Sequence, residues 1–219
     1  MNVKTLTKSV ITSTLLALSG PSFALDIAVS PIVDFSGWDT MPINNTISLS
    51  ASGADNLQRV TTDSTAEAFA ANVSVDSANC TAFCMARISR NIGTINGSPV
   101  YAEVRIGSWE GTPKAVYYSI RIFDTDTQTF VDEVSRGYFG DTNGENWSLG
   151  ESIGLAMGIE DQVAVFYSGN RAIILEVDLL GQLTPHDTPQ PYRLDLYSQE
   201  AGDSISATFD GFLDISLDM

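Results

Sequence analysis

Histidine and lysine, two residues on which much enzyme chemistry depends, are scarce in this sequence. It has one histidine, His186, and three lysines, of which Lys4 and Lys8 lie close to the N-terminus. A serine or cysteine nucleophile needs an imidazole or an equivalent base beside it. His186 lies in Thr-Pro-His-Asp-Thr-Pro, with no nucleophile motif nearby. The composition therefore gives little support to a nucleophilic triad, and Lys114 alone remains for lysine-based chemistry.

Cysteine is scarce too, since Cys80 and Cys84 are the only two. Two thiols supply half of the ligands of a zinc site, and His186 is far away in the sequence. Haem attachment needs two residues between the cysteines and a histidine after them, and neither condition is met. A separation of four residues can bring two α-carbons within bridging range. We therefore predict a local Cys80–Cys84 disulfide, formed in an oxidising compartment.

Positive charge is also in short supply. Eleven Lys and Arg residues face 27 Asp and Glu residues, which gives a formal net charge of −16. A field of this sign repels DNA and anionic bilayers, so neither is an expected partner. No glycine-rich loop follows a strand and opens a helix, which argues against a nucleotide site.

Apolar runs are short, and one mostly apolar stretch lies close to the N-terminus. Lys4 and Lys8 precede a mostly apolar stretch at 10–18, and Ser22-Phe23-Ala24 places small residues at both cleavage-determining positions. The stretch is too short to span a bilayer, which takes roughly 20 residues. We predict that residues 1–24 are a cleaved export signal, with a buried N-terminal helix as the alternative. Residues 25–219 are then one domain, periplasmic or secreted, with no membrane span.

Alternation of polar and apolar residues is the main pattern in the rest of the chain. At 101–106, Ala102, Val104 and Ile106 share one face, and Glu103 and Arg105 share the other. The segment 116–123 alternates in the same way, and a polar turn at 124–127 leads to a returning strand at 129–134. Short alternating segments separated by glycine and Asn/Asp clusters predict an all-β fold, an antiparallel two-sheet sandwich. Further strands are expected at 27–33, 46–50, 70–75, 87–92, 152–157, 162–167, 172–177, 192–198, 204–209 and 212–217.

Two segments, 64–73 and 184–191, are less regular than these strands. The spacing of a capping box is present in Ser64-Thr65-Ala66-Glu67, and Phe69 and Val73 follow at helical intervals. A short helix is therefore an alternative to a strand in this segment. Three prolines within 184–191 predict a loop.

The second half of the chain carries a succession of aromatic and glycine-containing motifs. Trp109-Glu110-Gly111 precedes the Tyr- and Arg-containing strand at 117–123, and Trp147-Ser148-Leu149-Gly150 comes later. Val165-Phe166-Tyr167 and the Ala-Thr-Phe-Asp-Gly-Phe run at 207–212 follow. Over about residues 100–217 this order resembles concanavalin A-like (laminin-G-like) jelly rolls. The resemblance implies a curved two-sheet sandwich whose concave face or rim loops often bind carbohydrate, and it implies no particular reaction.

A hydrolytic site of the kind found in the jelly-roll glucanases is not recognisable. The resemblance implies acids on one strand as Glu-x-Asp-x-x-Glu, but the nearest segment, 176–181, ends in glycine. Glycoside hydrolysis needs two carboxyls flanking one bond. The adjacent pairs Asp132-Glu133 and Glu160-Asp161 would point to opposite faces of a strand.

A ligand-binding face is the better hypothesis. Five of the nine basic residues after residue 24 fall on predicted strands, including Arg87 and Arg90. A guanidinium gives paired hydrogen bonds to sugar hydroxyls or carboxylates, and a tyrosine ring gives a stacking surface. Alternatively, these arginines only neutralise acids on neighbouring strands. The predicted binding residues are Glu103, Arg105, Tyr117, Arg121, Arg193, Asp195 and Tyr197.

We therefore expect an exported, non-catalytic binding protein for a glycan or another extracellular ligand. A polysaccharide-active hydrolase or lyase is the first alternative, and a structural or matrix-interaction protein is the second. No cofactor is expected apart from a possible structural calcium ion, because Asp124, Asp126, Asp141 and Asn143 offer oxygen ligands in short loops. Asx turns explain the same residues without a metal.

Overall fold

A computed structural model describes residues 26–109, 112–126, 129–139, 148–160, 163–169, 171–176 and 183–218. The predicted export signal, 1–24, lies outside the described residues. Within these ranges the chain forms strands and no helix, so no helix there is long and apolar enough to cross a membrane. The strands are β1 (Asp26–Pro31), β2 (Thr46–Ser52), β3 (Asn56–Thr61), β4 (Ala68–Asn79), β5 (Phe83–Ile95), β6 (Ser98–Trp109), β7 (Thr112–Asp124), β8 (Thr129–Tyr138), β9 (Ser152–Glu160), β10 (Val163–Ser168), β11 (Arg171–Glu176), β12 (Thr184–Pro185), β13 (Arg193–Ser198) and β14 (Ser204–Asp218).

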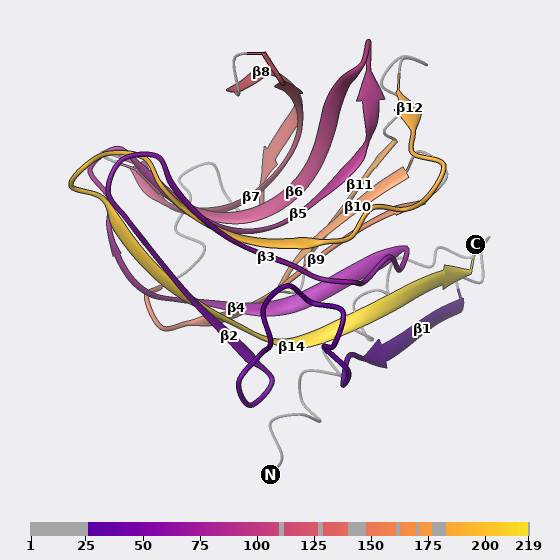
Figure 1. Cartoon of the computed structure of the whole chain (residues 1–219), viewed down its shortest axis with the longest axis horizontal. Coiled ribbons are helices and arrows are strands. Elements are labelled where there is room, and N and C mark those ends of the chain that lie inside the picture. Colours follow the sequence, from indigo (N-terminus) through magenta and orange to yellow (C-terminus); the bar gives the residue numbers. More distant parts are fainter. Residues whose placement is uncertain are drawn as a thin grey trace.

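These strands form two antiparallel sheets that pack face to face (Figure 1). The first sheet has the order β1-β14-β4-β9-β10-β11, and β2 also pairs with β14. The second has the order β3-β13-β5-β6-β7-β8, and β12 pairs with β5. Figure 1 shows the long strands β5 and β6 bending away from the first sheet, so the outward face of the second sheet is concave. The predicted all-β sandwich is confirmed.

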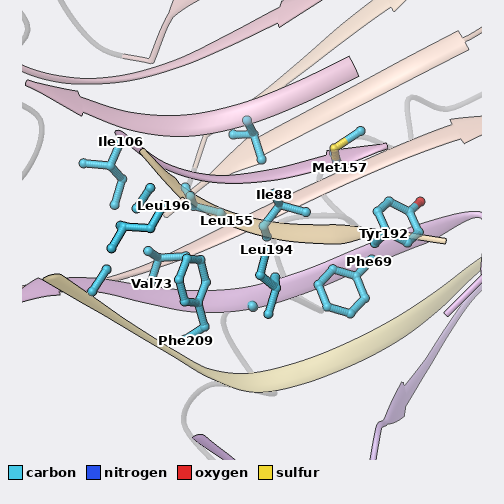
Figure 2. Packing of buried hydrophobic residues seen from close by; sticks show 14 of the residues in the cluster. Phe69, Val73, Ile88, Ile106, Leu155, Met157, Tyr192, Leu194, Leu196 and Phe209 are labelled. Carbon is cyan, nitrogen blue, oxygen red and sulfur yellow. The ribbon is translucent and has the colours of Figure 1, made fainter. Parts of the chain in front are cut away.

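Apolar side chains of the two sheets meet in one core (Figure 2). Phe69, Val73 and Phe209 come from the first sheet, and Ile88 and Leu194 come from the second. All five are fully buried or nearly so. The alternation read from the sequence is therefore the division between the core and the outward face of each sheet.

Residues 64–67 precede the strand β4, which contains Phe69 and Val73, so the helix considered there does not form and the strand expected at 70–75 is confirmed. Phe69 and Val73 are four residues apart, a spacing that also places them on one face of a strand. Ala71 and Val75 lie on the same face, and all four side chains are completely buried in the core. Helical periodicity would have put Ala71 elsewhere, so the burial available between the sheets decides for β4.

The two strands expected at 204–209 and 212–217 are one strand, β14. Its first part pairs with β2 and its last part with β1, while β4 lies along its other side. The register against β4 shifts between Asp210 and Leu213, and Gly211 there has a φ of +63°. A Cβ at Gly211 would lie 2.7 Å from Asn72 Nδ2. Glycine therefore allows the irregularity without ending the strand.

Two pairings were not expected from the sequence. Thr184 and Pro185, in the predicted loop, pair with Thr94 and Gly93 of β5 as the two-residue strand β12. The strand β3 was not predicted, and it adds an edge to the second sheet beside β13.

Leu194→Ala should destabilise the protein by about 3 kcal/mol, because Leu194 is completely buried and its truncation leaves a cavity between the sheets. Leu57→Ala is the matched control: Leu57 lies on the neighbouring strand β3 and is 41% exposed, so its loss should cost less than about 0.5 kcal/mol. Urea unfolding of both variants measures the difference. Equal losses would contradict the assignment of the core face.

Candidate functional site

The outward, concave face of the second sheet collects polar and aromatic side chains. Antiparallel register places Arg59 and Arg87 opposite Asp195, and Arg105 opposite Arg87 and Tyr117. Residues paired in this way project from the same side of a sheet. The concave face, as we use the term, consists of Arg59, Arg87, Ser89, Tyr101, Glu103, Arg105, Tyr117, Ser119, Arg121, Phe123, Phe130, Arg136, Tyr138, Arg193, Asp195 and Tyr197. It includes all seven residues predicted as a binding set.

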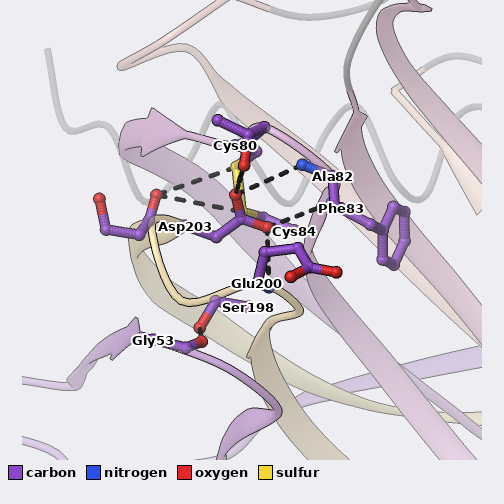
Figure 3. Close-up of a disulfide and its surroundings, with 10 residues drawn as sticks. Gly53, Cys80, Ala82, Phe83, Cys84, Ser198, Glu200 and Asp203 are labelled. Carbon is purple, nitrogen blue, oxygen red and sulfur yellow. Dashed lines mark hydrogen bonds between the residues drawn. A yellow bond between two sulfur atoms is a disulfide. The ribbon is translucent and has the colours of Figure 1, made fainter.

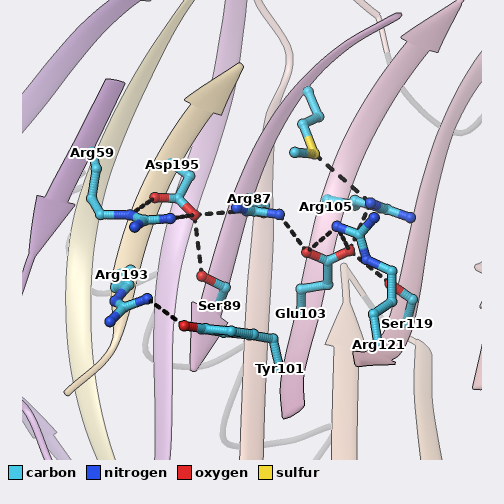
Figure 4. A network of polar contacts seen from close by, with 11 residues as sticks. Arg59, Arg87, Ser89, Tyr101, Glu103, Arg105, Ser119, Arg121, Arg193 and Asp195 are labelled. Carbon is cyan, nitrogen blue, oxygen red and sulfur yellow. Dashed lines mark hydrogen bonds and ion pairs between the residues drawn. The ribbon is translucent and has the colours of Figure 1, made fainter. Parts of the chain in front are cut away.

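Charged side chains cross this face as a chain of ion pairs (Figure 4). Asp195 accepts from Arg59 Nε at 2.6 Å and from Arg87 Nε at 2.7 Å. Arg87 Nη1 also binds Glu103 Oε2 at 2.7 Å, so one guanidinium joins both carboxylates. Glu103 in turn pairs with Arg105 at 2.6 Å.

Glu103 is enclosed by three guanidinium groups, because Arg121 Nη2 lies 2.9 Å from its Oε1. The Ser119 hydroxyl donates to the same oxygen at 2.7 Å. Burial of Glu103 favours its neutral form, but attraction to Arg105, Arg87 and Arg121 outweighs this effect and holds its pKa well below the ordinary value. Glu103 is therefore a fixed carboxylate.

Asp195 is held in the same way on the other side of Arg87. Burial opposes its ionisation, yet Arg87 and Arg59 lower its pKa below the ordinary value. Ser89 Oγ adds a hydrogen bond of 3.2 Å. The side chains of Asp195 and Glu103 are both 0% exposed, so these two predicted binding residues lie beneath the surface.

A second layer of side chains lies closer to solvent. Arg193 Nη1 donates to the Tyr101 hydroxyl at 3.3 Å, and both side chains are partly exposed. Tyr101 meets Phe123 and Phe130 edge to face, with ring centroids 6.3 and 6.0 Å apart. The Arg121 guanidinium lies 3.7 Å from the Phe130 ring centroid. This part of the face therefore combines aromatic rings with guanidinium groups.

Tyrosine and arginine also meet between β7 and β8. The rings of Tyr117 and Tyr138 lie 5.6 Å apart, and Arg105 is 4.0 Å from the centre of Tyr117. Arg136 lies against both rings and donates to the Tyr138 hydroxyl. Burial raises the pKa of Tyr117 to about 12, although Arg105 acts in the opposite direction. Tyr117 is therefore a neutral phenol at ordinary pH.

Tyr197, the last of the predicted set, lies at one end of the face. Its hydroxyl donates to Asp55 Oδ1 at 2.8 Å. Burial and this hydrogen bond raise its pKa to about 12. Tyr197 is partly exposed.

Arg90 takes a different position from Arg87 although both lie on β5. Its register partner is Ala102, on the core face. The Arg90 guanidinium donates to the backbone carbonyls of Ala66 and Gln190 and lies 4.6 Å from the Tyr192 ring centroid. Arg90 therefore fastens segments at the end of the sandwich and is not part of the concave face.

Sequence reasoning missed several members of the face, for identifiable reasons. Tyr101 has the same parity as Glu103 and Arg105, so the alternation already contained it. Arg59 lies on the unpredicted strand β3. Arg136 and Tyr138 lie beyond residue 134, where the predicted returning strand ended, whereas β8 continues to Tyr138.

The acids considered for calcium are partly described. Asp126 N donates to Asp124 Oδ1 at 2.8 Å, which is an Asx turn. Asp141 and Asn143 lie outside the described residues. Among the residues that are described, no group of three or more His, Cys, Asp or Glu side chains is placed to hold a metal ion.

The predicted disulfide is present, and a carboxylate organises its loop (Figure 3). Asp203 accepts hydrogen bonds from Thr81 N at 2.6 Å, Thr81 Oγ1 at 2.7 Å and Phe83 N at 3.3 Å. The two bonds from Thr81 go to Oδ1, whereas Glu200 N, like Phe83 N, donates to Oδ2. Burial disfavours the carboxylate, but the hydrogen bonds from Thr81 and its neighbours lower the pKa of Asp203 to about 2.

Comparison with known proteins identifies the fold. No protein-family model and no curated protein matches the sequence. Three similar solved structures are described as an endo-acting O-glycanase from human gut microbiota, an endo-1,3-β-glucanase (laminarinase) catalytic domain from Thermotoga petrophila RKU-1 and a β-1,3-1,4-glucanase (lichenase) from a mouse hindgut metagenome. Their TM-scores are 0.57, 0.53 and 0.52, at 11%, 10% and 9% identity.

Each alignment covers 87% of this chain and 97–98% of the other. The fold is therefore that of the concanavalin A-like jelly rolls. This coverage also shows that the structural similarity to these proteins extends well beyond residues 100–217, the part of the sequence that resembles the jelly rolls. At these identities, the likeness establishes the fold alone.

Glu103→Gln should destabilise the protein by about 3 kcal/mol or more, because three buried or half-buried guanidinium groups lose their shared counter-charge. Asp126→Asn, which removes one charge from an exposed turn, is the control and should change stability by less than about 0.5 kcal/mol. Chemical denaturation compares the two. A Glu103→Gln protein as stable as the control would show that the ion pairs are dispensable.

Asp203 should contribute stability that is lost in acid. Its folded pKa of about 2 lies below the ordinary value of 3.8, so the contribution is complete above pH 4 and falls as the pH drops towards 2. Asp203→Asn should therefore unfold more easily than the parent at pH 7, and the difference should shrink between pH 4 and pH 2. Thermal unfolding across this range measures it, and a constant difference would refute the assignment.

Proposed function

We propose that this protein is exported and binds a glycan chain across the concave face of its second sheet, without cleaving it. The observation that supports this proposal most is the combination of partly exposed arginines and aromatic rings on one curved surface. Arg193 and Tyr101 form one such pair, and Arg121 and Phe130 form another. A sugar offers hydroxyl groups on its edge and C–H groups on its face, so it matches both kinds of contact.

The buried ion pairs give this surface a rigid floor. Arg87 is held by two carboxylates, and Glu103 by three guanidinium groups. Side chains that are fixed in this way lose little conformational entropy when a ligand arrives. The arginines of the concave face are therefore fixed before a ligand arrives, which favours binding of the ligand to this surface.

The state of Glu103 and Asp195 argues against a role for either as the proton donor of a hydrolase. A glycosidase needs one carboxyl group that donates a proton to the leaving oxygen. Glu103 and Asp195 have lowered pKa values and accept hydrogen bonds on both oxygens. Neither acid retains a proton at neutral pH.

A polysaccharide-cleaving enzyme is the second candidate. The three similar structures described above are enzymes that act on glycans, which supports this reading of the fold. The specific observation in its favour is the convergence of Tyr117 and Tyr138 with Arg105 and Arg136. A phenol can transfer protons in catalysis, and nearby guanidinium groups can stabilise negative charge. This group of four residues is where a lyase or hydrolase activity would be centred.

Glycan array screening of the purified protein, followed by affinity measurement on the best ligand, tests the binding proposal. Tyr101→Ala should weaken binding by about tenfold or more, since a central tyrosine carries a large share of contact energy. Leu149→Ala is the control, because Leu149 is also exposed but lies in the turn before β9 of the first sheet. No binding to any glycan, or equal affinities for the two variants, would refute the proposal.

Release of reducing ends, or of products with a new double bond, distinguishes the second candidate. The binding proposal predicts no product above the background of boiled protein. Product formation that Tyr138→Phe abolishes would establish the enzyme instead.

A further inference from the structure

Positive charge is concentrated on the concave face of an otherwise acidic protein. Residues 25–219 contain nine Lys and Arg residues against 27 acids. The concave face as defined above contains two acids, Glu103 and Asp195, and the register adds Glu133 opposite Arg121. Six of the nine basic residues lie on the same face: Arg59, Arg87, Arg105, Arg121, Arg136 and Arg193. Arginine residues therefore outnumber acidic residues two to one on this face, whereas acidic residues outnumber basic ones three to one in residues 25–219 as a whole.

Four of these arginines share two buried carboxylates. Glu103 is shared by three guanidinium groups and Asp195 by two. Arg121 carries the clearest sign of the excess: its Nε is buried and has no hydrogen-bond partner. Burial and the charges of Arg105 and Arg87 outweigh the attraction of Glu103 and lower the pKa of Arg121. A ligand oxygen that accepts a hydrogen bond from Nε would satisfy this buried group.

The arginines that reach solvent are separated across the sheet. The side chain of Arg59 is 34% exposed and that of Arg121 is 16% exposed. Arg193 on β13 and Arg121 on β7 are three strands apart, which is about 14 Å at the usual spacing of strands. Aromatic rings lie between them, with Tyr101 on the intervening strand β6. A ligand that meets all of these groups is longer than one sugar.

We infer that the ligand of the concave face is an anionic polysaccharide with carboxylate or sulfate groups on its sugars. This inference rests on the proposed glycan-binding function and names its substrate class. The guanidinium fork matches carboxylate and sulfate oxygens in pairs, and such charge-assisted bonds are stronger than those to hydroxyl groups.

The remaining surface favours the same conclusion through repulsion. A net charge of −18 after removal of Lys4 and Lys8 repels a polyanion from the rest of the molecule. Since six arginines lie on the concave face, an acidic chain meets more positive charge there than the composition of the whole chain provides. Single-stranded nucleic acid combines charge and flat rings as well, so it is included in the test as a competing ligand.

Polymers of one backbone with and without charge provide the test. Polygalacturonate should bind at least about tenfold more tightly than its fully methyl-esterified form, and dextran sulfate more tightly than dextran. The affinity for either charged polymer should fall as NaCl is raised, because exposed ion pairs are screened. Calorimetry or affinity electrophoresis measures both effects. The two charged polymers distinguish carboxylate from sulfate as the preferred group.

Variants connect the preference to the arginines. Arg193→Gln and Arg59→Gln should each weaken binding of the better charged polymer by about tenfold, a larger loss than either variant causes for a neutral glycan. Arg171→Gln is the matched control, since it removes the same charge from β11 of the first sheet. Arg193→Lys keeps the charge but not the fork and should lie between the two. Thermal unfolding of each variant verifies that it is folded.

The outcomes separate this inference from the proposed function. Equal affinity for charged and neutral forms, with binding still dependent on Tyr101, would overturn the anionic ligand and leave glycan binding intact. Tighter binding of single-stranded DNA than of any acidic glycan would also overturn it. Failure to bind every charged and neutral glycan would refute the proposed function itself.

Discussion

The guanidinium of Arg87 joins Asp195 on β13 to Glu103 on β6, across the strand β5 that lies between them. Three strands are thereby locked in one register, because a slip of a single residue would carry these charges into the apolar core. Buried charges are tolerated only when they are paired with opposite charges, since removal of one partner leaves the other desolvated and unpaired. Three further arginines, Arg59, Arg105 and Arg121, complete the pairing of the two acids. The hydroxyl groups of Ser89 and Ser119 also donate hydrogen bonds to them.

The same interaction keeps Glu103 and Asp195 as carboxylates whose two oxygens both pair with arginine. In the proposed function these two acids fix the arginines, and the partly exposed arginines contact the ligand. The concave face thus has two layers: a buried floor of ion pairs and a partly exposed layer with Arg193, Tyr101 and Phe130. Function on this account depends on the outer layer, and stability depends on the floor.

Much of this could be predicted from alternation, because a period of two records which side chains face the core. The strands around 101–106 and 116–123, the disulfide and the shared face of Glu103, Arg105, Tyr117, Arg121, Arg193, Asp195 and Tyr197 all follow from local pattern or spacing. Two errors have a physical origin. Phe69 and Val73 fit a helix and a strand equally well until the burial of Ala71 between the sheets decides. The strand β3 has weak alternation of its own, and its pairing with β13, 130 residues later in the chain, gives Arg59 its place. The burial of Glu103 and Asp195 could not be read from sequence at all, since it depends on how many guanidinium groups converge from other strands.

A crystal structure of the protein with an acidic oligosaccharide tests the central claim most directly. We expect carboxylate or sulfate oxygens within hydrogen-bond distance of Arg193 and Arg121, and a sugar ring against Tyr101 or Phe130. The ion pairs of Arg87 with Glu103 and Asp195 should be unchanged. A ligand bound elsewhere on the sandwich, or one that displaces Arg87 to bind Glu103 or Asp195 itself, would contradict it.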